Sequence, residues 1–153
     1  MRIGTRLAVL AMAGLMLCWP AYGQTTISRA ERELFASVNQ ARRAQGLQPL
    51  RWDDSLAAAA RRHAKVMAEH GLAQHGFEGE PSLSARVKQA GAHFNWLSEN
   101  VTQGPTPEFI QAQFMRSLPH RANILDWDMD SIGIGVVERR GQLFAVEDLS
   151  QAR

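Results

Sequence analysis

The strongest constraint on the fold is a change in hydrophobic periodicity that begins near Ser131. From Ile132 to Val136, apolar residues alternate with glycines, which is the two-residue period of a β-strand. A turn over residues 139–142 separates this run from a second apolar run over 143–149, so the sequence predicts a two-stranded hairpin. Glycines inside the first strand predict that another element packs tightly against it.

The residues before this hairpin follow the helical period instead. Ser28 and Glu31 form the pattern of a capping box, which predicts a helix running to about Ala44. Asp53 or Asp54 is placed to cap a second helix that extends to about His70. The middle of that second helix, residues 57–60, is all alanine and would let a neighbouring element approach closely.

Shorter elements fill the middle of the chain. The sequence predicts a helix from about Ser82 to Gln89, a short strand or extended loop over 92–103, and a helix opened by Thr106 and Pro107. A stiff turn at Pro119 then places His120 at the start of a short helical turn. Helices first and a hairpin last predict a single layered α+β domain.

The first 23 residues have the pattern of a cleaved secretory signal peptide. Two arginines precede an apolar run from Leu7 to Trp19, which is too short to span a membrane, and Ala21-Tyr22-Gly23 forms a cleavage site. A lipoprotein signal using Cys18 is the alternative, but Leu17 suits it poorly. We therefore expect an exported protein, periplasmic or extracellular, with a short tether and helix start over 24–33 and one domain over 34–150.

Charge and cysteine content narrow the possible partners and chemistries. Signal removal takes Arg2 and Arg6 from the 17 basic residues, which leaves 15 against 15 acidic ones. A neutral chain gives no electrostatic reason to expect a nucleic-acid partner, and we expect no integral membrane segment after signal removal. Because Cys18 is the only cysteine, the exported chain is expected to lack disulfides, a cysteine nucleophile and thiolate metal ligands.

The histidines differ in what their surroundings predict. His63 lies on the apolar face of the second helix, which favours a buried, hydrogen-bonded core residue. His70 lies in the last turn of that helix, where the helix dipole favours a partly charged imidazole. His75 follows in a loop where no periodicity explains it, so it is a better candidate for a functional role, as is His120.

Several short motifs together resemble the CAP superfamily, also called SCP domains, which includes cysteine-rich secretory proteins, insect-venom antigens and plant pathogenesis-related proteins. The resemblance spans about Leu34 to Leu149 and implies a three-layer α-β-α sandwich with a central cleft. Its pieces occur in the order of the family: Asn39 and Arg42 in the first helix, Leu50-Arg51-Trp52-Asp53, His75, Ser98-Glu99-Asn100, Ser117 to Leu125, and the two closing strands.

The resemblance also implies a set of cleft residues. Many members hold two histidines and two glutamates there, and some bind a divalent metal. His75, Glu99 and His120 match three of these positions, while the second glutamate falls at Ser117. This chain therefore resembles the simpler bacterial members, and we count Ser117 and Asn100 as further cleft residues.

Two interpretations of the three matching residues remain open. Two imidazoles and a carboxylate could supply three metal ligands with water as the fourth, and zinc suits this set better than calcium does. The alternative is that Glu99 hydrogen-bonds both histidines and neighbouring backbone and holds the layers together without metal. Asn100 is expected to fix the backbone of its own extended segment through its side chain rather than to touch a ligand.

The function predicted from these features is an exported binding module. Its ligand would be a peptide, a lipid or a cell-wall component, which the resemblance permits without specifying. The alternative is a hydrolase, with Ser98 or Ser117 as nucleophile near His120 and with Glu99 orienting the imidazole. The sequence has no nucleophile elbow and no HExxH helix, so neither a serine hydrolase nor a metalloprotease is favoured.

Overall fold

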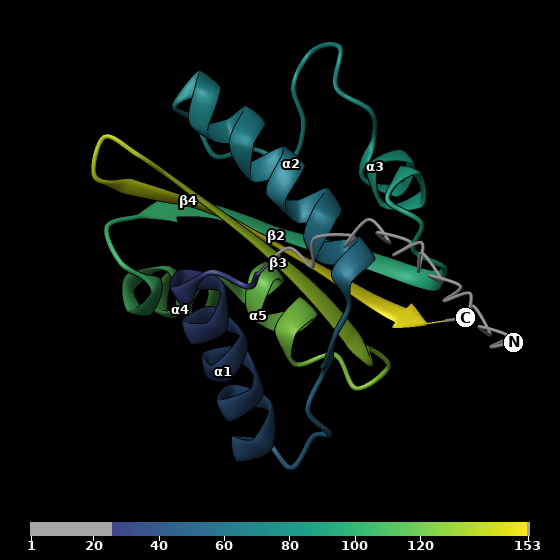
Figure 1. Cartoon of the computed structure of the whole chain (residues 1–153). Helices are drawn as coiled ribbons and strands as arrows, with labels where there is room; N and C mark the ends of the chain where they lie inside the picture. The colour runs from purple at the N-terminus through teal and green to yellow at the C-terminus, as the bar shows by residue number, and fades with distance from the viewer. Residues whose placement is uncertain (1–25, 153) are drawn as a thin grey trace, which may run out of the picture.

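The protein folds into a four-stranded sheet with helices on both of its faces (Figure 1). The computed structural model describes residues 26–152, so the predicted signal peptide and Cys18 lie outside the described residues. No helix within 26–152 combines the length and the apolar composition needed to cross a membrane. The elements are α1 (Arg29–Ala44), β1 (Arg51–Trp52), α2 (Asp54–His70), α3 (Leu83–Gln89), β2 (Phe94–Gly104), α4 (Pro107–Arg116), α5 (Leu118–Ile124), β3 (Ser131–Arg139) and β4 (Gln142–Ala152).

The strands are ordered β1-β3-β4-β2, with β1 parallel to β3 and the other neighbours antiparallel. The strands β3 and β4 form the predicted hairpin. Arg140 and Gly141 turn the chain there with φ of 52° and 75°, the left-handed pair that suits the twist of a tight hairpin. The segment predicted as a strand or extended loop is β2, which pairs with β4 along nearly its whole length.

The helices form two separate layers. α2 and α3 lie on one face of the sheet, and α1, α4 and α5 lie on the other (Figure 1). This arrangement confirms the predicted α-β-α sandwich. The predicted caps are also confirmed: Ser28 and Glu31 form a complete capping box on α1, and Asp53 accepts hydrogen bonds from the first turn of α2.

The backbones of β3 and α2 approach each other very closely. A Cβ atom built on Gly133 would lie 2.0 Å from the backbone nitrogen of Ala57, and one built on Gly135 would lie 2.2 Å from that of Arg61. The helix can come this near because its facing residues, such as Ala60, are small and fully buried. The glycines of β3 and the alanines of α2 each predicted that another element packs closely there, and the contact between β3 and α2 confirms both predictions.

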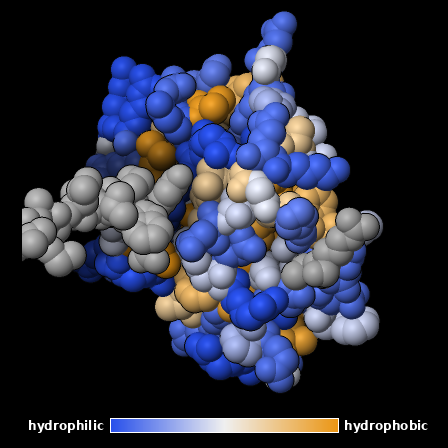
Figure 2. Space-filling model, turned by 45° about the vertical axis from the view of Figure 1, so that its right-hand side comes forward, coloured by the Kyte–Doolittle hydropathy of each residue, from blue (hydrophilic) through white to orange (hydrophobic). Residues whose placement is uncertain are grey.

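The other layer is fixed to the sheet by an apolar core and by one buried arginine. Leu34, Phe114 and Ile134 belong to the core cluster between α1, α4 and the sheet. Arg42 is 1% exposed, and its guanidinium donates to the carbonyls of Gln48, Ile124, Asp126 and Met129. The face drawn in Figure 2 is mostly hydrophilic, with hydrophobic residues in small separate patches.

Candidate functional site

The structure brings two of the predicted site residues into direct contact. His75 lies in the loop between α2 and α3, and Glu99 lies on β2. Nδ1 of His75 is 2.9 Å from Oε1 of Glu99. The His75 side chain is 63% exposed, whereas the Glu99 side chain is only 3% exposed. The buried carboxylate of Glu99 therefore fixes the exposed imidazole ring of His75 by a hydrogen bond.

Arg86 of α3 completes this arrangement and was not singled out in the sequence. Its guanidinium, 4% exposed, makes a short ion pair from Nη2 to Oε2 of Glu99. Nη1 donates to the carbonyls of His75 and Pro81, at 3.4 Å and 3.1 Å. One arginine thus neutralises the buried carboxylate and also holds the backbone of the loop that carries His75. In the sequence Arg86 looks like an ordinary polar residue of a short helix.

His63 lies beside this pair and has the buried, hydrogen-bonded position that was predicted. It is fully buried, with Nδ1 2.7 Å from Oε1 of Glu80 and Nε2 2.9 Å from the carbonyl of Gln74. Its Nε2 also lies 3.9 Å from Oε2 of Glu99. His63 therefore links α2 to the loop before α3 and stands directly behind the candidate site.

Two further carboxyl groups, on adjacent residues of β4, are fully buried. Asp148 pairs in register with Glu99, and Glu147 pairs with Asn100, so the two acids point to opposite faces of the sheet. Burial raises the pKa of Asp148 well above its ordinary value, and the nearby Glu99 raises that pKa further. Burial raises the pKa of Glu147 to about 7. In the sequence both residues stood out only as part of a strand motif.

Asn100 fixes the opposite face of β2 to α5. Its Nδ2 lies 3.2 Å from the carbonyl oxygen of His120 and 3.1 Å from Oε2 of Glu147, and its Oδ1 accepts from Asn123 at 2.9 Å. Asn100 does bond a backbone carbonyl, but the carbonyl belongs to α5 and not, as was predicted, to its own extended segment. Asn100 is completely buried and holds α5 in place.

His120 lies on α5, near enough to His75 for the charges of the two imidazoles to interact. Its ring packs edge-on against Phe114, with centroids 5.2 Å apart. Partial burial lowers the pKa of His120, and the neighbouring charge of His75 lowers it further. Ser117 joins α4 to α5, and its hydroxyl makes no capping hydrogen bond. His75 and Glu99 are therefore hydrogen-bonded, while the grouping of His120 and Ser117 with them in one cleft stays a prediction.

These positions do not form a ready metal site. Nowhere in residues 26–152 do three His, Cys, Asp or Glu side chains gather closely enough to hold a metal ion. Both oxygens of Glu99 are already engaged, one by His75 and one by Arg86. A zinc ion would have to displace a buried guanidinium to use this carboxylate, so the residues as arranged do not fit zinc.

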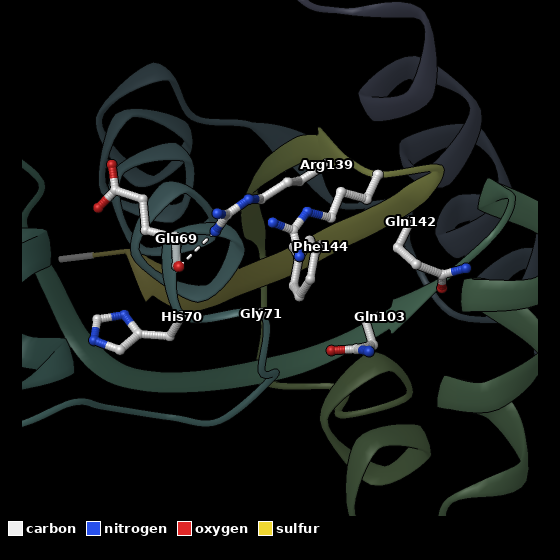
Figure 3. Close-up of a pocket in the computed structure, with 8 residues that line it drawn as sticks. Glu69, His70, Gly71, Gln103, Arg139, Gln142 and Phe144 are labelled. Carbon is white, nitrogen blue, oxygen red and sulfur yellow. Dashed lines mark hydrogen bonds between the residues drawn. The ribbon is translucent and has the colours of Figure 1, made fainter.

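A separate hollow of about 370 Å³ lies where the C-terminal end of α2 meets the β3–β4 turn (Figure 3). The guanidinium of Arg139 points from β3 to the end of α2 and donates to the carbonyls of Ala68 and Glu69. Both carbonyls belong to the last turn of the helix, where intrahelical donors run out, and that of Ala68 also accepts from the backbone nitrogen of Gly71. His70 bonds the carbonyl of Val66 and stacks on Phe77. Arg139 and His70 therefore hydrogen-bond the C-terminal carbonyls of α2 and so stabilise the end of this helix.

Comparison with known families and proteins gives consistent matches. The model of the cysteine-rich secretory protein (CAP) family matches residues 35–148. The uncharacterized protein YkwD of Bacillus subtilis (strain 168) is 31% identical over 115 residues, which are 74% of this chain and 45% of that protein. This chain therefore spans less than half the length of that relative.

Solved structures with the same fold include bacterial surface and extracellular proteins. An extracellular SCP-domain protein of Bacillus anthracis superposes with a TM-score of 0.70 at 23% identity, covering 78% of this chain and 39% of that one. An outer surface protein of Borrelia burgdorferi gives 0.76 at 19% identity, over 84% and 96%. NaASP2, solved with Zn²⁺, gives 0.61 at 12% identity, over 86% and 84%. At these identities the likeness establishes the fold.

Proposed function

Because this chain belongs to the cysteine-rich secretory protein (CAP) family, we propose that it is an exported binding module that contacts its ligand through His75. The observation that carries the proposal is the exposed imidazole fixed by a buried carboxylate, with 63% of the His75 side chain open to solvent. Export is supported by the signal pattern of residues 1–23 and by the extracellular and surface relatives.

The hydrogen bond to Glu99 determines what His75 offers to a ligand. A carboxylate can only accept, so Nδ1 of His75 carries the proton that it shares with Oε1. The other ring nitrogen, Nε2, is then an acceptor for an N–H or O–H group of a bound molecule. Arg86 keeps Glu99 in position and holds the His75 carbonyl, so the ring is oriented before any ligand arrives.

Zinc binding by His75, Glu99 and His120 is the less favoured form of this proposal. NaASP2 was solved with Zn²⁺, which is the reason to consider it. In this chain, however, Arg86 occupies one oxygen of Glu99 and His75 the other. Calorimetric titration with zinc of the metal-free chain should therefore give no site-specific heat. A saturable heat that His75→Ala removes would instead support the zinc site.

A hydrolase is the alternative activity, and the geometry supplies only part of it. His75 and Glu99 resemble a base with its orienting carboxylate. The neighbouring serine on β2, Ser98, precedes Glu99 by one residue and so leaves the strand on the opposite face. The hydroxyl nearest in sequence to His120 is that of Ser117, at the α4–α5 junction. Ser98 Oγ is buried and has no hydrogen-bond partner within residues 26–152, so it makes no hydrogen bond to His120, the base of the predicted hydrolase, and this favours binding over turnover.

The test uses His75→Ala, with His93→Ala as the matched control because His93 is an exposed histidine in the loop before β2. The full chain and both variants are incubated with peptidoglycan sacculi, with phosphatidylglycerol–phosphatidylethanolamine vesicles and with an unstructured peptide library. We expect retention on one of the three probes, and a loss of about tenfold in affinity in His75→Ala only.

Two results would contradict the binding proposal. Retention on none of the three probes, or equal retention by wild type and His75→Ala, would show that the imidazole is not a ligand contact. A panel of ester and peptide substrates serves as the second readout. Turnover that His75→Ala abolishes would support the hydrolase instead.

A further inference from the structure

We propose that the opposite face of the sheet carries a second site, a carbohydrate-binding hollow in which a neutral pyranose ring stacks on Trp96. The hollow has a volume of about 380 Å³ and is lined by Trp96, Asp126, Asp128 and Gln151. This volume falls near the lower end of the range of small-molecule sites, roughly 300–1,000 Å³. Trp96 and Glu99 are three residues apart on β2, so their side chains leave the strand on opposite faces.

The aromatic wall of this hollow is unusually open for its residue type. Trp96 is 63% exposed, although a tryptophan side chain gains much by burial. Gln151 is the cross-strand partner of Trp96 on β4, which sets an amide directly beside the indole. Within residues 26–152, neither side chain has a protein partner for its hydrogen-bonding groups. The pair thus offers an apolar ring face together with unused donors and an acceptor.

The acidic wall comes from the loop between α5 and β3, which is held rigidly. The buried guanidinium of Arg42 donates to the carbonyls of Ile124, Asp126 and Met129. The backbone nitrogen of Asp130 donates to the carbonyl of Ser150, next to Gln151, at 3.0 Å. These bonds fix the loop against the end of β4 before any ligand binds, which lowers the entropic cost of binding.

The two carboxylates of this loop, Asp126 and Asp128, differ in how many of their acceptor oxygens already have a hydrogen-bond partner. Oδ1 of Asp126 accepts from the backbone nitrogen of Asp128 at 2.9 Å, which orients that side chain. The Asp128 carboxylate has no protein partner within residues 26–152. Since each carboxylate oxygen can accept more than one hydrogen bond, the wall presents several free acceptors to the hollow.

A sugar ring matches this combination of groups. The C–H face of a pyranose packs on an indole, its hydroxyls donate to the aspartates, and Gln151 can both donate and accept. No basic residue belongs to the lining within the described part of the chain, so an anionic ligand would be repelled. A neutral ligand with many hydroxyls uses the aromatic face, the acceptors and the donors together.

The test follows the Trp96 indole signal by NMR in the full chain, with methyl glucoside and N-acetylglucosamine as neutral probes. Both Trp96→Ala and Asp128→Asn should weaken binding about tenfold or more, since the first removes the stacking face and the second replaces a charged acceptor oxygen with an NH2 donor. For Trp96→Ala, binding is followed on the ligand signals. Trp127→Ala is the matched control, because this tryptophan is 78% exposed on the same loop but does not line the hollow. His75→Ala should also leave sugar binding unchanged, because His75 lies on the other face.

The expected result is a saturable shift at millimolar sugar that the two control variants retain. All of the substituted side chains are exposed, and unchanged circular dichroism and thermal unfolding would show that each variant is folded. The proposal is overturned if no saturable shift occurs, or if Trp96→Ala binds as well as the wild type. It is also overturned if tetramethylammonium shifts the signal and neither sugar does, which would assign the hollow to organic cations.

Discussion

Nδ2 of Asn100 lies 3.1 Å from Oε2 of Glu147, and the two residues are direct partners across β2 and β4. The amide donates to one carboxyl oxygen, while the other, Oε1, has no partner within residues 26–152. A fully buried carboxyl with one donor binds its proton more tightly than an exposed one does, which is why burial raises its pKa to about 7.

Glu147 should make the stability of the protein fall as the pH rises. Between its unfolded pKa of 4.5 and its folded pKa of about 7, the folded state keeps a proton that the unfolded state has released. The free energy of unfolding therefore decreases with pH over this interval, by about 3 kcal/mol from this group. Glu147→Gln should lose less stability than wild type between about pH 4.5 and about pH 8, as measured by urea unfolding. Parallel curves for the two proteins would contradict this, and exposed Glu138→Gln is the control.

Removing Arg86 should strongly destabilise the fold. Arg86→Met leaves the carboxylate of Glu99 buried without its cation and frees the carbonyls of His75 and Pro81. We expect a loss of about 3–5 kcal/mol in the free energy of unfolding at neutral pH, measured by chemical denaturation. The exposed Arg43→Met on α1 should change it by about 0.5 kcal/mol or less. An Arg86 variant as stable as wild type would show that Glu99 needs no cation.

A methyl group should not be tolerated between β3 and α2. In Gly135→Ala the new Cβ would lie 2.2 Å from the nitrogen of Arg61 and 2.3 Å from the carbonyl carbon of Ala60. Both are helix backbone atoms that cannot rotate away, so the loss should reach about 3 kcal/mol or more, the upper end of overpacking costs. Gly76→Ala, where nothing lies within 4 Å, should stay within about 0.5 kcal/mol of wild type. Similar melting temperatures for both variants would refute the close packing.

The pKa of His120 should reflect both the burial of its ring and the charge of the neighbouring His75. NMR of its ring protons should give a pKa below the ordinary value of 6.5, because burial disfavours the imidazolium and the charge of His75 adds to this. In His75→Gln the His120 pKa should rise but stay below 6.5, since burial is the larger cause. His93→Gln is the control and should leave the titration of His120 unchanged. A midpoint at or above 6.5 in the wild type would place His120 in water.

Local patterns allowed most of the fold to be predicted. The capping box at Ser28 and Glu31, the cap at Asp53 and the turn at Arg140-Gly141 each satisfy backbone groups a few residues away. Such signals depend only on neighbouring residues, so they can be read without coordinates. The packing of α2 on β3 was also predictable, because the small residues on both sides appear as compositional patterns.

The candidate site was predictable only in part. The absence of periodicity around His75 and the family resemblance indicated His75 and Glu99, and these two are in contact. Nothing local indicated Arg86, Glu80 or Asp148, because each acquires its importance from a residue distant in the chain. The resemblance also grouped His120 with Glu99. The structure packs the His120 ring on Phe114 and leaves it near enough to His75 for the charge of His75 to lower its pKa, so this grouping stays a prediction.

The sequence by itself determined the helices, the closing hairpin and the layered class of this protein, because hydrogen bonds within an element and the period of its apolar residues are local properties. Only the tertiary structure decided which charges are buried together and which face of β2 each side chain serves. Those outcomes depend on burial and on strand register, which bring Asp148 beside Glu99 and Glu147 beside Asn100 across the width of a sheet.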